Sequence, residues 1–239
     1  MVLKDKTALI TGASDGIGKA IAFALSREVK ELVLFGRDRK KLKKVASWCK
    51  DEGAEKVSTY AIDFLKKELL EERLDDIRRQ HNNVSILINN AGVWQRAGSL
   101  DSVTLDKIEE IIRVNLISPI KITKMFLPIL RAQPEAYIVN IISKSGIKVQ
   151  KGQSVYTASK FGLRGFTEVL QEDLKDSNVK VVGVYQSGTK TNFFKKAGEE
   201  ISPDRFNTYI EPEELALLFV NLMKSSDSLW VSDITVNHS

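Results

Sequence analysis

Tyr156 and Lys160 stand four positions apart in a stretch predicted to be helical, so their side chains are expected on one helix face. Such a pair could transfer a proton to oxygen. Addition of hydride to a ketone leaves charge on the ketone oxygen, which needs a proton donor within hydrogen-bonding distance. A free tyrosine has a pKa near ~10, and a neighbouring ammonium group stabilises its phenolate and lowers that value. Alone, the pair is a weak signal, because this spacing is common on exposed helices.

A glycine-rich turn near the N-terminus could bind phosphate. It joins a strand predicted at 7–11 to a helix predicted at 16–28, and it contains Gly12, Ser14, Asp15, Gly16, Ile17 and Gly18. Glycine lets the backbone approach a pyrophosphate closely, and a helix N-terminus supplies unpaired N–H groups to bind it. A tight turn that only packs the helix closely is the alternative. Its place in the first strand–turn–helix unit favours the nucleotide site.

The elements that must position these residues alternate along the whole chain. Short β-branched runs predict strands at 7–11, 31–36, 57–61, 84–89, 136–142, 179–185 and 229–236. Longer apolar periodicities predict helices at 16–28, 38–52, 66–81, 104–131, 155–176 and 211–225. Almost wholly apolar strands indicate a parallel sheet that is covered on both faces. The prediction is therefore a single α/β domain over 1–239, a doubly wound Rossmann-type fold with a seven-stranded parallel sheet.

These motifs resemble those of the short-chain dehydrogenase/reductase family, from Thr11 to about Thr191. The family's T-G-x-x-x-G-x-G pattern begins at Thr11, and its N-N-A-G element appears as Asn89-Asn90-Ala91-Gly92. The separation between Ser143, which follows an apolar strand, and Tyr156 also matches the family. The resemblance, which includes the family's 3-oxoacyl reductases, implies an NADP(H)-dependent oxidoreductase that acts on a carbonyl or secondary alcohol.

The resemblance also implies roles for single residues. Tyr156 would be the catalytic acid/base, Ser143 would polarise the carbonyl, Lys160 would also bond the nicotinamide ribose, and Asn115 would help to hold a water that leads to the lysine. Alternatively, Asn115 bonds to backbone for structural reasons, since an unsatisfied Asn in an apolar helix is costly. Asp63 would bond the adenine, or would simply be solvated at a strand end. The expected cofactor contacts are Gly12, Ser14, Asp15, Gly16, Ile17, Gly18, Arg37, Asp63, Phe64, Asn90, Ala91, Gly92, Tyr156, Lys160, Ser187, Thr189 and Thr191.

The end of the second strand predicts which dinucleotide binds. NAD-specific enzymes need a carboxylate there for the adenosine ribose hydroxyls. Gly36 occupies that position, and Arg37 beside it could form charge-assisted bonds to a 2′-phosphate. Asp38 could reach the ribose or cap the next helix, and the basic run Arg39–Lys44 favours the cap. NADP(H) is the predicted cofactor.

The substrate end departs from the family pattern. Where relatives usually carry Pro-Gly, this chain has Gln186-Ser187, which is expected to alter the backbone at the start of the loop. The long connection after the sixth strand predicts a substrate lid at 188–205. The candidate substrate contacts, which suggest an apolar or aromatic substrate, are Trp94, Ser145, Val149, Gln150, Phe193 and Phe194; each could instead be core packing.

Composition limits the remaining classes. The chain has 43% hydrophobic and 28% charged residues and a net charge of +5, as a globular protein does. The single cysteine, Cys49, excludes internal disulfides and cysteine-based metal sites, and it is expected to be a core thiol. No metal is predicted. No run has the length of a signal peptide or a membrane span, so a cytoplasmic location without a membrane partner is expected. Nucleic-acid binding is disfavoured, because no aromatic residues are interleaved with the basic run.

Assembly and rival functions complete the expectations. The helix at 104–131 carries more apolar surface than a single contact face would use. Similar proteins pair this helix and the Tyr156 helix across a two-fold axis. A homodimer or homotetramer is therefore expected, with deeper burial against the sheet as the alternative. The rival functions are an NAD-dependent alcohol dehydrogenase and a nucleotide-binding sensor without turnover.

Overall fold

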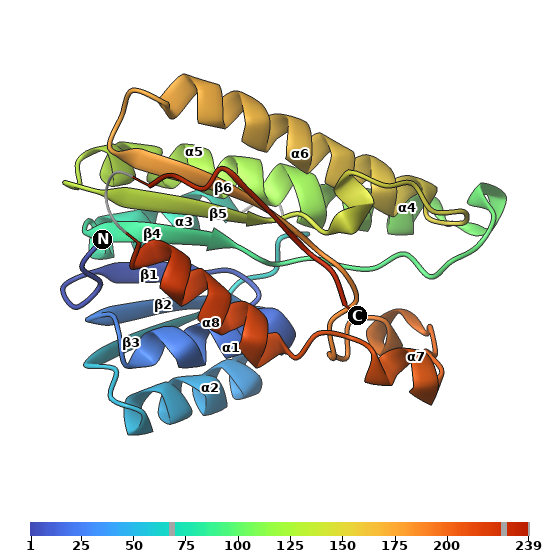
Figure 1. Cartoon of the computed structure of the whole chain (residues 1–239), viewed down its shortest axis with the longest axis horizontal. Helices are drawn as coiled ribbons and strands as arrows, with labels where there is room; N and C mark the ends of the chain where they lie inside the picture. Colours follow the sequence, from blue (N-terminus) through green and yellow to red (C-terminus); the bar gives the residue numbers. More distant parts are fainter. Residues whose placement is uncertain (67–69, 226–228, 239) are drawn as a thin grey trace.

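The computed structural model describes residues 1–66, 70–225 and 229–238. Within these residues, seven parallel strands form one sheet in the order β3-β2-β1-β4-β5-β6-β7 (Figure 1). The strands are β1 (Thr7–Ile10), β2 (Glu31–Gly36), β3 (Lys56–Ala61), β4 (Val84–Asn89), β5 (Ala136–Ile141), β6 (Val179–Gln186) and β7 (Asp233–Val236). The helices are α1 (Gly16–Ser26), α2 (Arg39–Asp51), α3 (Leu70–Gln80), α4 (Leu105–Ile112), α5 (Ser118–Arg131), α6 (Ser154–Leu174), α7 (Pro203–Asn207) and α8 (Pro212–Met223). The doubly wound α/β fold expected from the sequence is confirmed.

Two hydrophobic cores lie on the two faces of the sheet. Successive residues of one strand alternate between them: Leu32 and Leu34 pack with α1, α2 and α8, whereas Val33 and Phe35 pack with α3, α5 and α6. Figure 1 shows these two helical layers on opposite sides of the sheet. Cys49 is a buried core thiol, as expected, and burial raises its pKa to about 12. Strands such as β2 are buried on both faces, which explains their nearly continuous apolar sequence.

The helix predicted at 104–131 is interrupted. Its middle, Arg113–Ile117, is π-helical, with the Ser118 N–H bonded to the Arg113 carbonyl. The extra residue per turn lets the Asn115 side chain reach the backbone of Val93. π-Helical turns of this kind occur mostly within α-helices and often at functional sites.

The last strand is shorter than predicted and begins at Asp233. Before that point the indole N–H of Trp230, rather than a backbone group, bonds the Val181 carbonyl at 3.1 Å. In the helix predicted at 66–81, residues 67–69 lie outside the described residues. No helix in the described part of the chain is long and apolar enough to cross a membrane.

Candidate active site

A cavity of about 670 Å³ opens at the carboxyl ends of the strands, where the strand order reverses between β1 and β4. In open α/β sheets this reversal is where ligands bind. Turns after β1, β2 and β4 line one end of the cavity. The start of α6 and the segment after β6 line the other end.

Two turns interlock beneath the first end. The Asn90 Nδ2 donates to the Thr11 carbonyl at 2.9 Å, and the Thr11 hydroxyl accepts from the N–H groups of Asn90 and Ala91. Gly12 has a φ of 67°, and a Cβ there would lie 2.9 Å from Ala91 Cα. A Cβ at Gly18 would lie 2.4 Å from Asn90 Nδ2. Only glycine fits both positions, so the backbone of the turn forms an open cradle.

Asp15 caps the start of α1 and faces the segment that follows β6. Its carboxylate accepts from the Gly16 N–H at 2.8 Å and pairs with the ammonium group of Lys196 at 2.8 Å. Burial acts to raise the pKa of Asp15, but Lys196, together with the Gly16 N–H and the charge of Lys41, outweighs it and holds the pKa below its usual value. The segment predicted as a lid therefore contacts the glycine-rich turn directly.

The end of β2 presents the cations of Arg37 and Lys41, which lie 3.7 Å from the Glu110 carboxylate and 3.5 Å from the Asp15 carboxylate, respectively. Arg37 lines the cavity with its guanidinium largely exposed. The Asp38 carboxylate accepts from the N–H groups of Lys40 and Lys41 at 2.9 and 3.0 Å. These bonds hold its pKa below the usual value, mainly through the Lys41 N–H. The interpretation of Asp38 as a helix cap is confirmed.

Ser143, Tyr156 and Lys160 meet at the other end of the cavity. Ser143 follows β5 and is the only non-glycine residue with positive φ (94°) in the described ranges. Strained backbone of this kind persists where the surroundings enforce it, often in active sites. Burial raises the pKa of Tyr156 well above its usual value, and its hydrogen bond with Ser143 offsets this only in part. Tyr156 therefore remains protonated at neutral pH.

Lys160 is as deeply buried as the tyrosine. Its Nζ donates to the Ile141 carbonyl at 3.0 Å and lies 5.7 Å from the centre of the Tyr156 ring. Burial lowers the pKa of Lys160 to about 7. The expectation that an ammonium group lowers the pKa of Tyr156 does not hold in this state, because burial disfavours the charged form of both groups.

Asn115 lies behind the cavity and does not line it. Its Oδ1 accepts from the Val93 N–H at 2.8 Å, and its Nδ2 donates to the Val93 carbonyl and to the Ser159 hydroxyl. The side chain thus ties the segment after β4 to α6. This is the structural alternative considered for Asn115, while a role in holding water remains a prediction.

Gln95 was not anticipated from the sequence. Its Oε1 accepts from the N–H groups of both Val155 and Tyr156 at 3.0 Å, and its Nε2 donates to the Gly152 carbonyl at 3.2 Å. The residue before the helix, Gln153, makes no side-chain cap. Gln95 therefore caps, from a distant segment, the helix that carries Tyr156.

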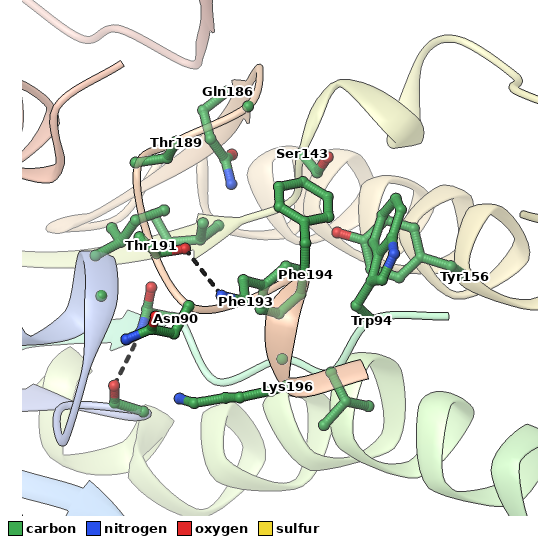
Figure 2. A pocket seen from close by; sticks show the side chains of 18 of the residues that line it. Asn90, Trp94, Ser143, Tyr156, Gln186, Thr189, Thr191, Phe193, Phe194 and Lys196 are labelled. Carbon is green, nitrogen blue, oxygen red and sulfur yellow. Dashed lines mark hydrogen bonds between the residues drawn. The ribbon is translucent and has the colours of Figure 1, made fainter. Parts of the chain in front are cut away.

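Aromatic rings fill the space beside Tyr156 (Figure 2). The Trp94 ring centre lies 4.5 Å from that of Tyr156 and 4.9 Å from that of Phe194. Phe193 lies 6.0 Å from Trp94 and 6.3 Å from Tyr156. The carboxylate of Glu199, also not anticipated, accepts from the Trp94 indole N–H at 2.6 Å. These contacts hold the segment after β6 against the segment after β4.

The structure brings most of the predicted site residues to one cavity. Its lining includes Gly12, Ser14, Asp15, Gly16, Ile17, Arg37, Phe64, Asn90, Ala91, Gly92, Trp94, Ser143, Ser145, Gln150, Tyr156, Lys160, Ser187, Thr189, Thr191, Phe193 and Phe194. Asp63 does not line it and accepts from the Leu65 N–H. Gly18 lies beneath the cradle. Val149 does not line the cavity and is 72% exposed.

The comparisons with known proteins agree with this geometry. The sequence model of the family described as short chain dehydrogenase matches residues 6–202. An uncharacterized oxidoreductase of Staphylococcus aureus is 30% identical over 235 residues, 98% of each chain. An alcohol dehydrogenase from the archaeon Thermococcus sibiricus, solved with 5-hydroxy-NADP, superposes with a TM-score of 0.87 at 26% identity, covering 98% of this chain and 96% of that one. A metagenomic short-chain oxidoreductase, solved with NADP, superposes with a TM-score of 0.85 at 28% identity, covering 100% of this chain and 99% of that one.

Proposed function

Because the chain belongs to the short-chain dehydrogenase family, we propose that it transfers hydride between NADP(H) and a carbonyl or secondary alcohol, with Tyr156 as acid/base. One observation carries the proposal. Half-buried Ser143 and buried Tyr156 share a single cavity with a glycine cradle at the N-terminus of α1. A dinucleotide has the length and chemistry to connect these two ends.

The residues present suit a dinucleotide. The cradle at Gly12 lies at the start of α1, where helix N–H groups can bind the pyrophosphate. At the opposite end, the Oε1 of Gln186 is buried and has no partner among the described residues. It can accept a hydrogen bond from a carboxamide, and the hydroxyls of Thr189 and Thr191 line the same part of the cavity. When bound, the reduced nicotinamide supplies the hydride.

NADP(H) fits the end of β2 better than NAD(H) does. Arg37 and Lys41 line the cavity there, and the Asp38 carboxylate is already committed to the first turn of α2. A carboxylate at position 36 would also need space, because a Cβ on Gly36 would lie 3.0 Å from the Ser14 hydroxyl. Arg37 and Lys41 remain largely exposed although they lie 3.7 Å from Glu110 and 3.5 Å from Asp15, respectively. Two exposed cations beside a carboxylate that already caps α2 favour a 2′-phosphate over two ribose hydroxyls.

For reduction, the hydroxyl groups of Ser143 and Tyr156 bind the carbonyl oxygen and stabilise the charge that develops on it. The raised pKa of Tyr156 keeps its proton in place until that charge appears, and Tyr156 then donates the proton to the new alkoxide. Lys160, with a pKa of about 7, can carry a positive charge near neutral pH and stabilise the tyrosinate. The balanced reaction consumes one NADPH and one proton per carbonyl and releases NADP⁺ and an alcohol.

The segment at 188–205 is proposed to act as the substrate lid. It reaches both sides of the cavity, through Lys196 to Asp15 and through Glu199 to Trp94. Its release would admit substrate, and its closure would exclude water from the Tyr156 hydroxyl, which strengthens electrostatic stabilisation.

Assembly through α4 and α6 is also proposed. Leu105 on α4 is 83% exposed and Val169 on α6 is 61% exposed, while Phe161 adds a half-exposed ring. The two helices pack against each other, so these side chains can form one apolar face suited to a second copy.

The direct test is NADPH consumption by the purified chain with a panel of aldehydes and ketones. The proposal expects stoichiometric alcohol formation and a ratio of kcat/KM for NADPH over NADH of at least tenfold. Tight binding of NADPH without turnover of any carbonyl would instead indicate a nucleotide-binding protein without catalysis.

A further inference from the structure

The substrate end of the cavity is built from aromatic rings. Four rings next to one another, those of Tyr156, Trp94, Phe193 and Phe194, have centres 4.5 to 6.3 Å apart. Their planes meet at 57° to 80°, the edge-to-face arrangement that aromatic rings prefer. Figure 2 shows the two phenyl rings next to Trp94, and Ser143 and Tyr156 line the same pocket.

Trp94 is buried and lies outside the proposed lid. It is 6% exposed, and its indole N–H donates to Glu199 at 2.6 Å. The same carboxylate oxygen accepts from the Ala97 N–H at 3.1 Å. The plane of the indole is therefore set while the proposed lid is closed, and the Glu199 carboxylate at this end of the cavity is occupied by donors.

Phe193 and Phe194 are the members of the cluster that would move with the proposed lid. Both are half-buried, and they lie on the lid beside a 3₁₀ turn that ends at Gly198 in the left-handed region (φ 73°). They occupy the space that a substrate needs in order to reach the Tyr156 hydroxyl. When they withdraw, they leave a site lined by the ring surfaces of Trp94 and Tyr156.

We propose that this site selects aryl aldehydes and aryl ketones, whose ring takes the positions of Phe193 and Phe194 against Trp94. The inference rests on the proposed carbonyl reduction and names its substrate class. A planar ring can restore the edge-to-face contacts that the two phenyl rings give up. A saturated ring of the same carbon count buries similar apolar area but restores none of them.

Matched pairs of carbonyl compounds test the proposal: acetophenone against cyclohexyl methyl ketone, and benzaldehyde against cyclohexanecarbaldehyde. The expected ratio of kcat/KM is about tenfold in favour of each aryl compound, equivalent to about 1.4 kcal/mol. Conjugation makes aryl carbonyls less electrophilic, so intrinsic reactivity opposes this preference and cannot produce it. Equal or reversed ratios in both pairs would overturn the proposal, while the carbonyl reductase function would stand. Absence of turnover for all four compounds would overturn both.

Two variants assign the preference to the cluster. Trp94→Leu keeps an apolar side chain without a ring, and Glu199→Ala frees the indole without removing any ring. Each is expected to bring the aryl-to-cyclohexyl ratio below about threefold, and the Glu199 variant keeps the proposal testable should the Trp94 variant not fold. Glu200→Ala, at an exposed neighbouring position, is the matched control and should keep the full ratio. Ratios that persist in both cluster variants would contradict the role of Trp94.

Discussion

Replacement of Gln95 should damage both the fold and catalysis, because one side chain caps the helix that carries Tyr156. In Gln95→Leu the shape is nearly kept, but the N–H groups of Val155 and Tyr156 lose their shared acceptor. Gln95 is 1% exposed, so water does not replace it readily. An unsatisfied buried donor costs about 1–3 kcal/mol, and the loss of a helix cap costs about 0.5–2 kcal/mol. We expect the free energy of unfolding to fall by about 2–4 kcal/mol.

The catalytic effect follows from position. Tyr156 lies in the first turn of α6, where the loss of a cap acts most strongly. We expect kcat to fall at least tenfold, while KM for NADPH changes less than threefold, because the cradle at Gly12 lies on other elements. Urea unfolding followed by circular dichroism measures the first effect, and steady-state kinetics measures the second.

Gln95→Glu is the matched comparison. A carboxylate keeps an acceptor for both N–H groups and is favoured at a helix N-terminus, although it loses the donor to the Gly152 carbonyl. It should retain more stability and activity than Gln95→Leu. The capping role assigned to Gln95 is wrong if the free energy of unfolding of Gln95→Leu lies within about 0.5 kcal/mol of the wild-type value, the size of a neutral surface change, and the variant keeps the wild-type kcat.

Three further predictions concern cofactor choice, stability and assembly. Arg37→Ala should lower kcat/KM for NADPH about tenfold or more and leave that for NADH unchanged; equal losses with both cofactors would contradict the phosphate contact. Lys160→Met should abolish turnover yet raise the free energy of unfolding at pH 7 by about 1–2 kcal/mol. The pKa of Lys160 is about 7 in the folded chain and about 10.4 in the unfolded chain, so the unfolded chain binds more protons between these two pH values. The wild type therefore gains stability as the pH rises through this range. Urea unfolding should show that the stability advantage of the variant shrinks toward pH 10. Val169→Asp should convert a dimer to a species near 26.8 kDa in light scattering, and a wild type that is already of this mass would refute the α4–α6 interface.

The parts of the site that follow local rules could be predicted from the sequence. The glycine cradle follows a strand and opens a helix, and Asp38 caps α2 as its place before the basic run indicated. Apolar periodicity placed the strands well, because two buried faces impose a strong pattern. These features depend on neighbours in the chain, which a single sequence displays.

The parts that depend on distant contacts could not be predicted. Gln95 caps a helix that begins far along the chain, and Glu199 bonds the indole of Trp94 across the cavity. No local pattern marks either residue. Val149, expected as a substrate contact, does not line the cavity, and a loop has no periodicity that tells an inward side chain from an exposed one. The pKa of Tyr156 was expected to fall, and the depth of its burial, which sets the direction, is a property of the folded chain alone.

The central claim is that Tyr156 supplies the proton for carbonyl reduction, and Tyr156→Phe tests it most directly. The substitution removes one hydroxyl and keeps the ring that packs against Trp94, so the fold should be intact. Steady-state turnover and NADPH affinity should be measured on the same preparation, with an aldehyde and a ketone as substrates. The account predicts a fall in kcat of at least a hundredfold, in line with the usual contribution of a general acid of about 10²–10⁴, with the Kd for NADPH within threefold of the wild type. Retention of more than a tenth of the wild-type kcat, with NADPH still bound, would contradict it.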